Sequence, residues 1–421
     1  MVSDISNFIG YDDFSDNRFL VTCRTASYTM ASRFEQIKGT DFTHYIIHPF
    51  DTDEIEAFFS KWYLRYEIEI KRRVEAAEAE AEKNLIRMMT VVKNDRNIFN
   101  IATNPLMLTI LALIEHEGGE LPKDRADLYA KCLKTLSGSW ENLRSLYESE
   151  KRGFKLGNKN ITEDFIVYYL GPIAFDMHLK AQPDIDYETL KEALTKKFDL
   201  GNKDMLLSKE QAADFILIMK ERSGILQEVT AGTYGFIHLT FKEYLAARSL
   251  TDLSDDIIDE LGDNLFKPEW KEVVLLTATS LKRKGASNFI EAVFKKKQDN
   301  FQNLILAGEC TLDSSIDNID EGLYDNLINE MSCVIYDDVP VKERVEVGEI
   351  LGWLGDTRDP KVFIPVVGGE YQLDQKVTNI KPFEIGKYPV TNSWFEEFIK
   401  ADGYKNKGYW SKEGLRWLAH T

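Results

Sequence analysis

The sequence predicts a mainly α-helical, multidomain protein, and three observations carry this prediction. Apolar residues recur at helical spacing over most of residues 51–144, 161–222 and 252–360. A β-hairpin signal interrupts the helices at residues 224–238, where two strand-like runs flank a turn that contains Gly232. After residue 363 the pattern changes to turns, short strands and aromatic-rich loops. The expected fold is a series of helical regions with one winged-helix hairpin and an α+β tail.

Residues 1–50 alternate between strand-like and helix-like pieces. Residues 18–23 read as a short buried strand, and Tyr45 to Ile47 as a second one closed by Pro49. Two strands cannot bury their own faces. We therefore expect this segment to be the remnant of an α/β sheet whose other strands lie upstream.

The boundaries of the regions after residue 50 are placed where the hydrophobic pattern of the sequence changes. Asp51 and Thr52 are good helix caps that begin the next region. Residues 301–312 and 344–356 look like loose copies of one amphipathic helix, which favours HEAT-like stacked helices. The predicted domains are an α/β remnant (residues 1–50), a helical region (51–150), a winged helix (151–250), a helical-repeat region (251–362) and a short tail (363–421).

Composition restricts the function classes. The chain has 421 residues and a formal net charge of -18, which argues against a general nucleic-acid-binding surface. The four cysteines form no CxxC pair and meet no histidine cluster, so we expect no metal site and a reducing compartment. The longest uncharged run, residues 97–114, contains Asn, Thr and Pro and predicts a buried helix, not a membrane span.

The first candidate motif is FLVTCRT at residues 19–25. Thr22 and Arg24 would project from the carboxyl end of a strand, which is where α/β sheets bind ligands. A single arginine at such a position is more often solvated or paired with a carboxylate.

The second motif is NPLMLTIL at residues 104–111. Proline is favoured in the first turn of a helix, so Pro105 needs no function to explain it. The functional alternative is that its ring packs against a nucleotide base.

The third motif is FIHLTFKEYLAA at residues 236–247, which places His238 between a strand and a helix. Its imidazole would either satisfy a buried carbonyl or donate a hydrogen bond to a phosphate oxygen. Lys242 is expected to face solvent.

In this order, the three motifs resemble the NACHT family of STAND signalling NTPases. That family has a sensor strand, a helical lid with an Asn-Pro-Leu helix, and a winged helix with the third motif. The resemblance covers residues 1–250 and implies that Thr22 and Arg24 form the sensor. It also implies that Pro105 packs on the base of ADP or ATP and that His238 contacts the β-phosphate.

The 421 residues contain no G-x-x-x-x-G-K-[ST] loop and no acidic strand end that would hold magnesium. Backbone N–H groups of that loop bind the phosphates, and its lysine and hydroxyl bind the phosphates and the metal. We therefore expect no catalytic residues, no bound cofactor and no NTPase activity in this chain alone. ADP or ATP would bind only in an intact parent protein, of which this chain would be a fragment.

The tail carries a second resemblance. Residues 364–371 (IPVVGGEY), 382–392 (PFEIGKYPVTN) and 408–414 (GYWSKEG) resemble the opening of a formylglycine-generating enzyme, or sulfatase-modifying factor, domain. The catalytic cysteines of that family lie beyond the matching segment. No residue here is therefore assigned that catalysis.

The sequence thus predicts a cytoplasmic regulatory fragment of a STAND NTPase, switched by ADP and ATP in defence or stress signalling. Its partners would be proteins or further copies of the NACHT module, with no nucleic acid, no membrane and an unidentified activating ligand. The alternative is a non-catalytic interaction protein that binds partners through its helical repeats and aromatic tail.

Overall fold

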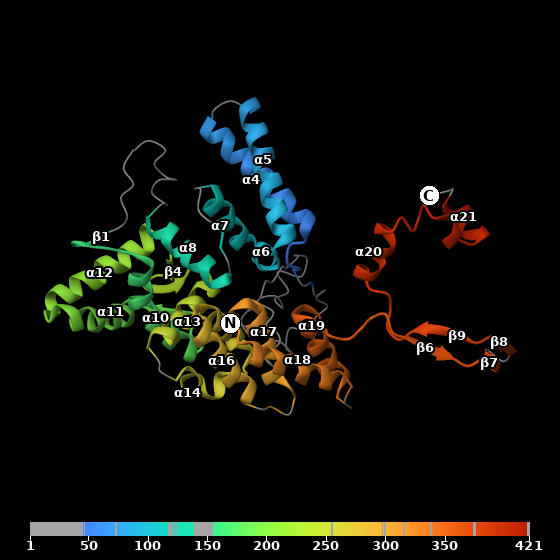
Figure 1. The fold of residues 1–421 in the computed structure, drawn as a ribbon. Helices are drawn as coiled ribbons and strands as arrows, with labels where there is room; N and C mark the ends of the chain where they lie inside the picture. Colours follow the sequence, from blue (N-terminus) through green and yellow to red (C-terminus); the bar gives the residue numbers. More distant parts are fainter. Residues whose placement is uncertain are drawn as a thin grey trace, which may run out of the picture. The chain divides into compact units, whose positions relative to one another are not determined.

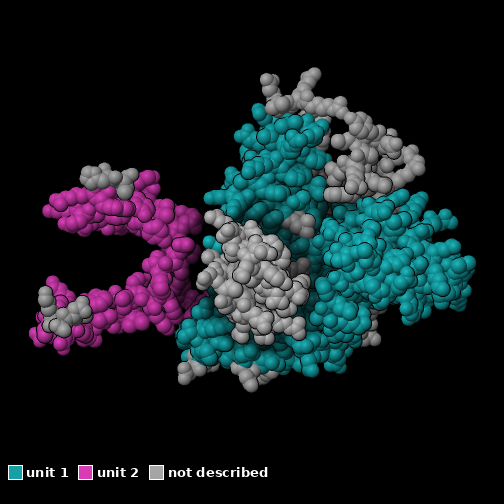
Figure 2. All heavy atoms as spheres, turned by 180° about the vertical axis from the view of Figure 1, so that it is seen from behind, with its two compact units in different colours: residues 1–354 teal, residues 355–421 magenta. Residues whose placement is uncertain are grey.

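The computed structural model describes residues 45, 47–71, 74–116, 121–122, 124–138, 155–253, 256–296, 298, 300–314, 316–336, 339–373 and 376–418. The chain divides into two compact units, residues 1–354 and 355–421, which Figure 2 colours separately. Helices dominate the first unit (Figure 1), whereas the second contains short strands and short helices. The mainly α, multidomain fold with an α+β tail is confirmed.

The first unit opens with a group of helices. They are α4 (Thr52–Lys71), α5 (Val74–Asn94), α6 (Arg96–Ala102), α7 (Pro105–His116) and α8 (Arg125–Gly138). Asp51 and Glu54 cap α4 reciprocally, each carboxylate accepting the other residue's backbone N–H, at 2.9 and 3.0 Å. Ile55, Phe59 and Tyr63 recur every four residues and are fully buried, so one face of α4 packs into the core.

A winged-helix arrangement follows. Its elements are β1 (Lys155–Leu156), β2 (Lys159–Asn160), α10 (Glu163–Leu179), β3 (Asp184–Asp186), α11 (Tyr187–Asn202), α12 (Met205–Glu221), β4 (Leu226–Thr230), β5 (Thr233–Phe236) and α13 (Leu239–Leu253). The sheet order is β3-β5-β4, and both pairings are antiparallel. Gly232 turns the predicted hairpin with a φ of 74°.

Helices α10 and α13 form the main packing of this region. They approach so closely that a Cβ at Gly171 would lie 3.1 Å from the carbonyl oxygen of Leu245. A side chain there would separate the two helices. This close contact fixes α13, whose first turn follows His238.

The last part of the first unit is again helical. Its elements are α14 (Ile257–Leu261), η3 (Gly262–Asn264), η4 (Pro268–Trp270), α15 (Lys271–Ser280), α16 (Arg283–Lys295), α17 (Gln302–Asp313), η5 (Ile316–Asn318), α18 (Glu321–Tyr336) and α19 (Val341–Leu354). Helix α15 packs against α13, and α17 packs against α15, α16, α18 and α19. The core of the winged helix therefore continues into these helices.

The second unit contains β6 (Phe363–Val366), β7 (Gly369–Leu373), β8 (Lys376–Ile380), β9 (Phe383–Gly386), α20 (Asn392–Lys400), η6 (Lys407–Tyr409) and α21 (Lys412–Leu418). Strand β6 pairs with β9 and β7 with β8, both antiparallel. Aromatic rings contact one another around Phe398, Tyr404 and Trp410. Among its described residues, however, no hydrophobic side chain belongs to the buried core.

The predicted α/β remnant at residues 1–50 lies almost entirely outside the described residues. Tyr45 and Ile47 are described, and the strand predicted there is not found: both are outside regular structure and are 85% and 91% exposed. An apolar run becomes a strand only where a neighbouring strand accepts its hydrogen bonds.

None of the helices that the structure describes combines the length and apolar composition needed to cross a bilayer. The described residues also contain no group of three or more His, Cys, Asp or Glu side chains arranged to hold a metal ion.

Candidate functional site

His238 lies between β5 and the first residue of α13, at the strand-to-helix junction that the sequence predicted. Its side chain is partly buried. The backbone N–H of Thr240 donates to Nδ1 of the ring at 3.3 Å, and the Thr240 hydroxyl oxygen lies 2.9 Å from the same nitrogen. The first turn of α13 therefore fixes the orientation of the imidazole.

Tyr129 of α8 continues this arrangement. It is 2% exposed and its side chain is hydrogen-bonded to Thr240. Its ring lies edge-on to Phe241 at 5.5 Å and stacks on Tyr244 at 5.3 Å between centroids. Burial raises the pKa of Tyr129 to about 12, so its hydroxyl keeps its proton at physiological pH.

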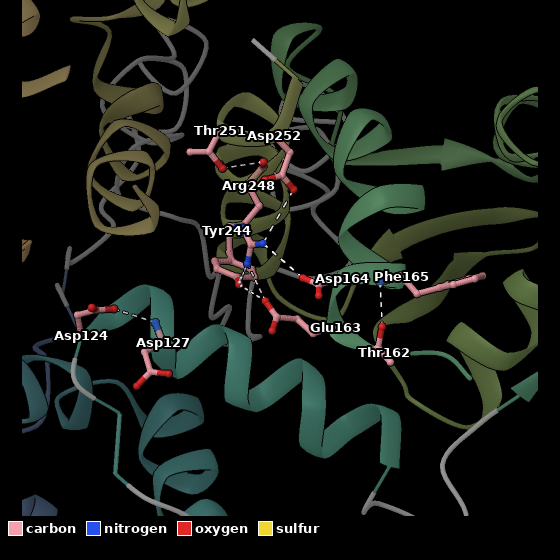
Figure 3. Close-up of polar contacts among 10 residues, drawn as sticks. All are labelled: Asp124, Asp127, Thr162, Glu163, Asp164, Phe165, Tyr244, Arg248, Thr251 and Asp252. Atoms are coloured by element: carbon pink, nitrogen blue, oxygen red, sulfur yellow. Dashed lines mark hydrogen bonds and ion pairs between the residues drawn. The ribbon is translucent and has the colours of Figure 1, made fainter. Parts of the chain in front are cut away.

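A second polar network holds the body of α13 against the start of α10 (Figure 3). The hydroxyl of Tyr244 donates to Oε1 of Glu163 at 2.8 Å, and Arg248 donates to the same oxygen at 2.7 Å. Arg248 also donates to the Tyr244 hydroxyl oxygen at 2.9 Å. Asp164 and Asp252 lie 3.7 and 3.9 Å from Arg248.

Burial dominates the electrostatics of this network. Tyr244 is fully buried, and this burial raises its pKa well above its usual value. Tyr244 is therefore a hydrogen-bond donor to Glu163. Because a partly buried carboxylate needs hydrogen-bond partners, Tyr244 and Arg248 together offset the cost of removing Glu163 from water.

The expectation that Lys242 faces solvent is wrong. Lys242 is 5% exposed, and its ammonium group donates to the carbonyl oxygen of Gln182 at 3.0 Å. The segment between α10 and β3 covers this face of α13. A sequence pattern cannot show which segment returns to cover a given helix face.

His178 lies near Lys242 and is another buried basic side chain. Its Nε2 is 3.0 Å from the carbonyl oxygen of Glu269, and its ring lies edge-on to Trp270 at 4.5 Å. Desolvation first, and then the charge of Lys242, lower the pKa of His178 to about 4. His178 is therefore neutral at physiological pH.

Pro105 is the first residue of α7 and is exposed. Asn104 precedes it and accepts the backbone N–H of Met107 at 3.3 Å, as a helix cap does. Helices α7 and α13 both pack against α8. Pro105 and His238 therefore stand at the starts of two helices that share one neighbour.

Thr22 and Arg24 lie outside the described residues, and their predicted sensor role stays a prediction. Sequence reasoning missed Tyr129, Glu163 and Arg248. The only available signal was Tyr244 within the third motif, because a tyrosine in a buried helix needs a partner for its hydroxyl. Nothing in the sequence identified the partner of Tyr244, which is Glu163, 81 residues upstream.

Two family models match the chain. Residues 125–250 match the winged helix-turn-helix domain C-terminal to NACHT. Residues 356–420 match the sulfatase-modifying factor enzyme 1-like domain. No curated protein matches the chain significantly. The chain thus carries a winged helix of the type that follows a NACHT module, and the resemblance predicted for each of the two matched segments is confirmed.

Proposed function

We propose that this chain is a regulatory part of a NACHT-type STAND NTPase, in which the winged helix reads the nucleotide held by a P-loop segment. In this proposal His238 donates to the β-phosphate, Pro105 packs on the base, and Thr22 and Arg24 sense phosphate from their strand. ADP stabilises the closed state and ATP the open one, which associates with other copies. The pathway is defence or stress signalling, in the cytoplasm.

The observation that carries the proposal is the position of His238 in a domain matched to the winged helix C-terminal to NACHT. The ring is held at the N-terminal end of α13 by Thr240. Backbone N–H groups at a helix start favour anions, so a phosphate beside His238 would meet favourable charge.

The same proposal holds that these 421 residues do not hydrolyse ATP alone. They contain no glycine-rich loop with the lysine and hydroxyl that catalysis of phosphoryl transfer requires. We expect purified chain to show no ATPase activity above background. Turnover that disappears in His238→Ala or Arg24→Ala would contradict this expectation.

The nucleotide role is tested by joining the chain to a NACHT segment that carries a G-x-x-x-x-G-K-[ST] loop and titrating it with ADP. A hydrogen bond to a charged group contributes about 1.5–3 kcal/mol, so His238→Ala is expected to weaken ADP binding about 10-fold or more. Lys196→Ala, on the exposed face of α11, is the control and leaves the affinity unchanged.

The second candidate is a non-catalytic interaction protein. It is favoured by the apolar side chains on the second unit, where Val367, Tyr409 and Trp417 are 78%, 65% and 54% exposed. In that case the helices of residues 251–362 and the tail bind protein partners, and His238 is a relic. Failure of the joined protein to bind ADP, with its P-loop intact, would favour this candidate.

A further inference from the structure

A hollow of about 350 Å³ lies beside helix α17, in the part of the first unit where α17 packs against both α15 and α19. Helix α17 gives one wall, helix α19 gives a second, and the segment that leads into α15 gives a third. We call this hollow the α17 groove. Its lining includes Lys271, Ile305, Leu306, Glu309, Glu346 and Ile350.

The floor of the α17 groove is apolar and closely packed. Ile305, Leu306 and Ile350 are 5%, 6% and 7% exposed. Gly308 lets α19 approach α17, because a Cβ at this position would lie 2.6 Å from Cγ2 of Ile350. The groove is therefore a fixed feature of the helix packing. An apolar side chain could cover its floor without separating the helices.

The walls of the α17 groove carry carboxylates that lack full compensation. Glu309 pairs with Lys271 at 2.7 Å. Burial nevertheless raises the pKa of Glu309 above its usual value, and the nearby charge of Glu346 adds to this effect. Glu346 meets Lys342 at 3.9 Å, but the Lys342 side chain is 80% exposed and such a pair is weak. A further cation beside Glu309 and Glu346 would therefore be stabilised.

A second hollow, of about 470 Å³, adjoins the α17 groove, because both are lined by Leu265, Phe266 and Lys267. A chain segment could run from one hollow into the other past these shared residues. Among the described residues that line the two hollows, five are acidic and three are lysines. This excess of negative charge favours an occupant that brings positive charge.

We propose that the α17 groove is a docking site for a segment of another protein that carries a lysine or arginine beside an apolar side chain. The apolar side chain covers Ile305 and Leu306, and the cation lies between Glu309 and Glu346. A second copy of this chain fits less well, because two chains of formal net charge -18 repel each other. The proposal gives the second candidate function a site and does not depend on the nucleotide role of His238.

The probe is a displayed library of random-sequence peptides, selected on the immobilised 421-residue chain. We expect the selected peptides to be enriched in lysine or arginine next to an apolar residue. Binding of one selected peptide, labelled with a fluorophore, is then measured by fluorescence anisotropy. Amide hydrogen exchange locates the bound peptide, and we expect slower exchange in α17 and α19.

The test variant carries Glu346→Lys and Glu349→Lys, which reverse two charges on the α19 wall. We expect it to bind the selected peptide about 10-fold more weakly or worse. The matched control carries Asp325→Lys and Glu330→Lys, which reverse two exposed charges on α18 outside the described lining of both hollows. It should retain the wild-type affinity, although its net charge changes equally. Glu346→Gln with Glu349→Gln should weaken binding less than the reversal, and circular dichroism confirms that each variant is folded.

Three results would overturn the proposal: no enrichment in the selection, selected peptides that are acidic or purely apolar, or equal affinities for the α19 and α18 variants. Self-association that only the α19 variant abolishes would assign the groove to a second copy and would also overturn it. The ADP titration of the joined protein is a separate measurement. Loss of peptide binding with normal ADP binding refutes the docking site alone, and the reverse result refutes the nucleotide role alone.

Discussion

At the scale of single residues, the buried bases of the winged helix make the protein sensitive to acid. His178 has a pKa of about 4 in the folded chain and about 6.5 when unfolded, because burial and Lys242 disfavour its charged form. The stability that its neutral form contributes is present above pH 6.5 and is lost as the pH falls toward 4.

We therefore predict that the free energy of unfolding decreases by about 2 kcal/mol through this residue between pH 7.5 and pH 5.0. Urea unfolding at the two pH values measures the change. His178→Gln cannot titrate and should show a pH dependence smaller by that amount. Equal pH dependence in both proteins would show that His178 titrates normally in the folded state.

The hydroxyl of Tyr244 gives a second prediction at this scale. Removing it in Tyr244→Phe breaks a hydrogen bond to a charged, part-buried Glu163 and is expected to cost about 1–3 kcal/mol of unfolding free energy. Tyr168→Phe is the control, because Tyr168 is 48% exposed. Chemical unfolding measures both. If the two variants lose equally little stability, Tyr244 does not hold Glu163.

Single residues were predictable from sequence only where local pattern decides their position. The place of His238 followed from a strand signal that ended directly before a helix signal. The burial of Lys242 did not follow, because the covering carbonyl of Gln182 comes from 60 residues upstream. The hydrogen-bond partners of Tyr129 and Tyr244 did not follow from the sequence either, because they also lie far away along the chain.

At the scale of elements, Arg125 joins the start of α8 to two later helices. It forms ion pairs with Glu272 of α15 and with Asp313 of α17, the latter at 3.1 Å. The side chains of Arg125 and Asp313 are 23% and 19% exposed. These partly buried carboxylates would face each other's charge without the guanidinium between them.

Arg125→Met is therefore predicted to lower the free energy of unfolding by about 2 kcal/mol, after allowance for partial exposure. Adding Glu272→Gln and Asp313→Asn should recover part of that loss. Lys196→Ala breaks an exposed pair with Glu192 and serves as the control, with a change within about 0.5 kcal/mol. A loss in Arg125→Met that the added substitutions do not reduce would exclude an ionic origin.

Elements differ in how far the sequence predicted them. The hairpin of β4 and β5 was predicted because strand-like runs flank a glycine turn. Strand β3 was missed, because its three residues, Asp184 to Asp186, show no apolar alternation, and its pairing with β5 joins segments far apart in the sequence. The helices of residues 252–360 were predicted from their periodicity, and their HEAT-like repetition stays a prediction.

At the scale of the whole molecule, the winged helix shares one continuous hydrophobic core with the helices that follow it, and residues 355–421 form a separate second unit. The motifs predicted the types of domain because they occur along the chain in the same order as in the family that they resemble. They could not supply contacts between distant segments, since those depend on how the helices pack. The domain boundaries proposed from sequence stay predictions.

The most direct test of the central claim is amide hydrogen exchange over residues 233–250 in the protein joined to a P-loop segment. We predict that ADP slows exchange there, because the proposed contact places the β-phosphate at the start of α13, and that the effect is lost in His238→Ala. Unchanged exchange over these residues, with ADP demonstrably bound at the P-loop, would contradict the claim that this winged helix reads the nucleotide.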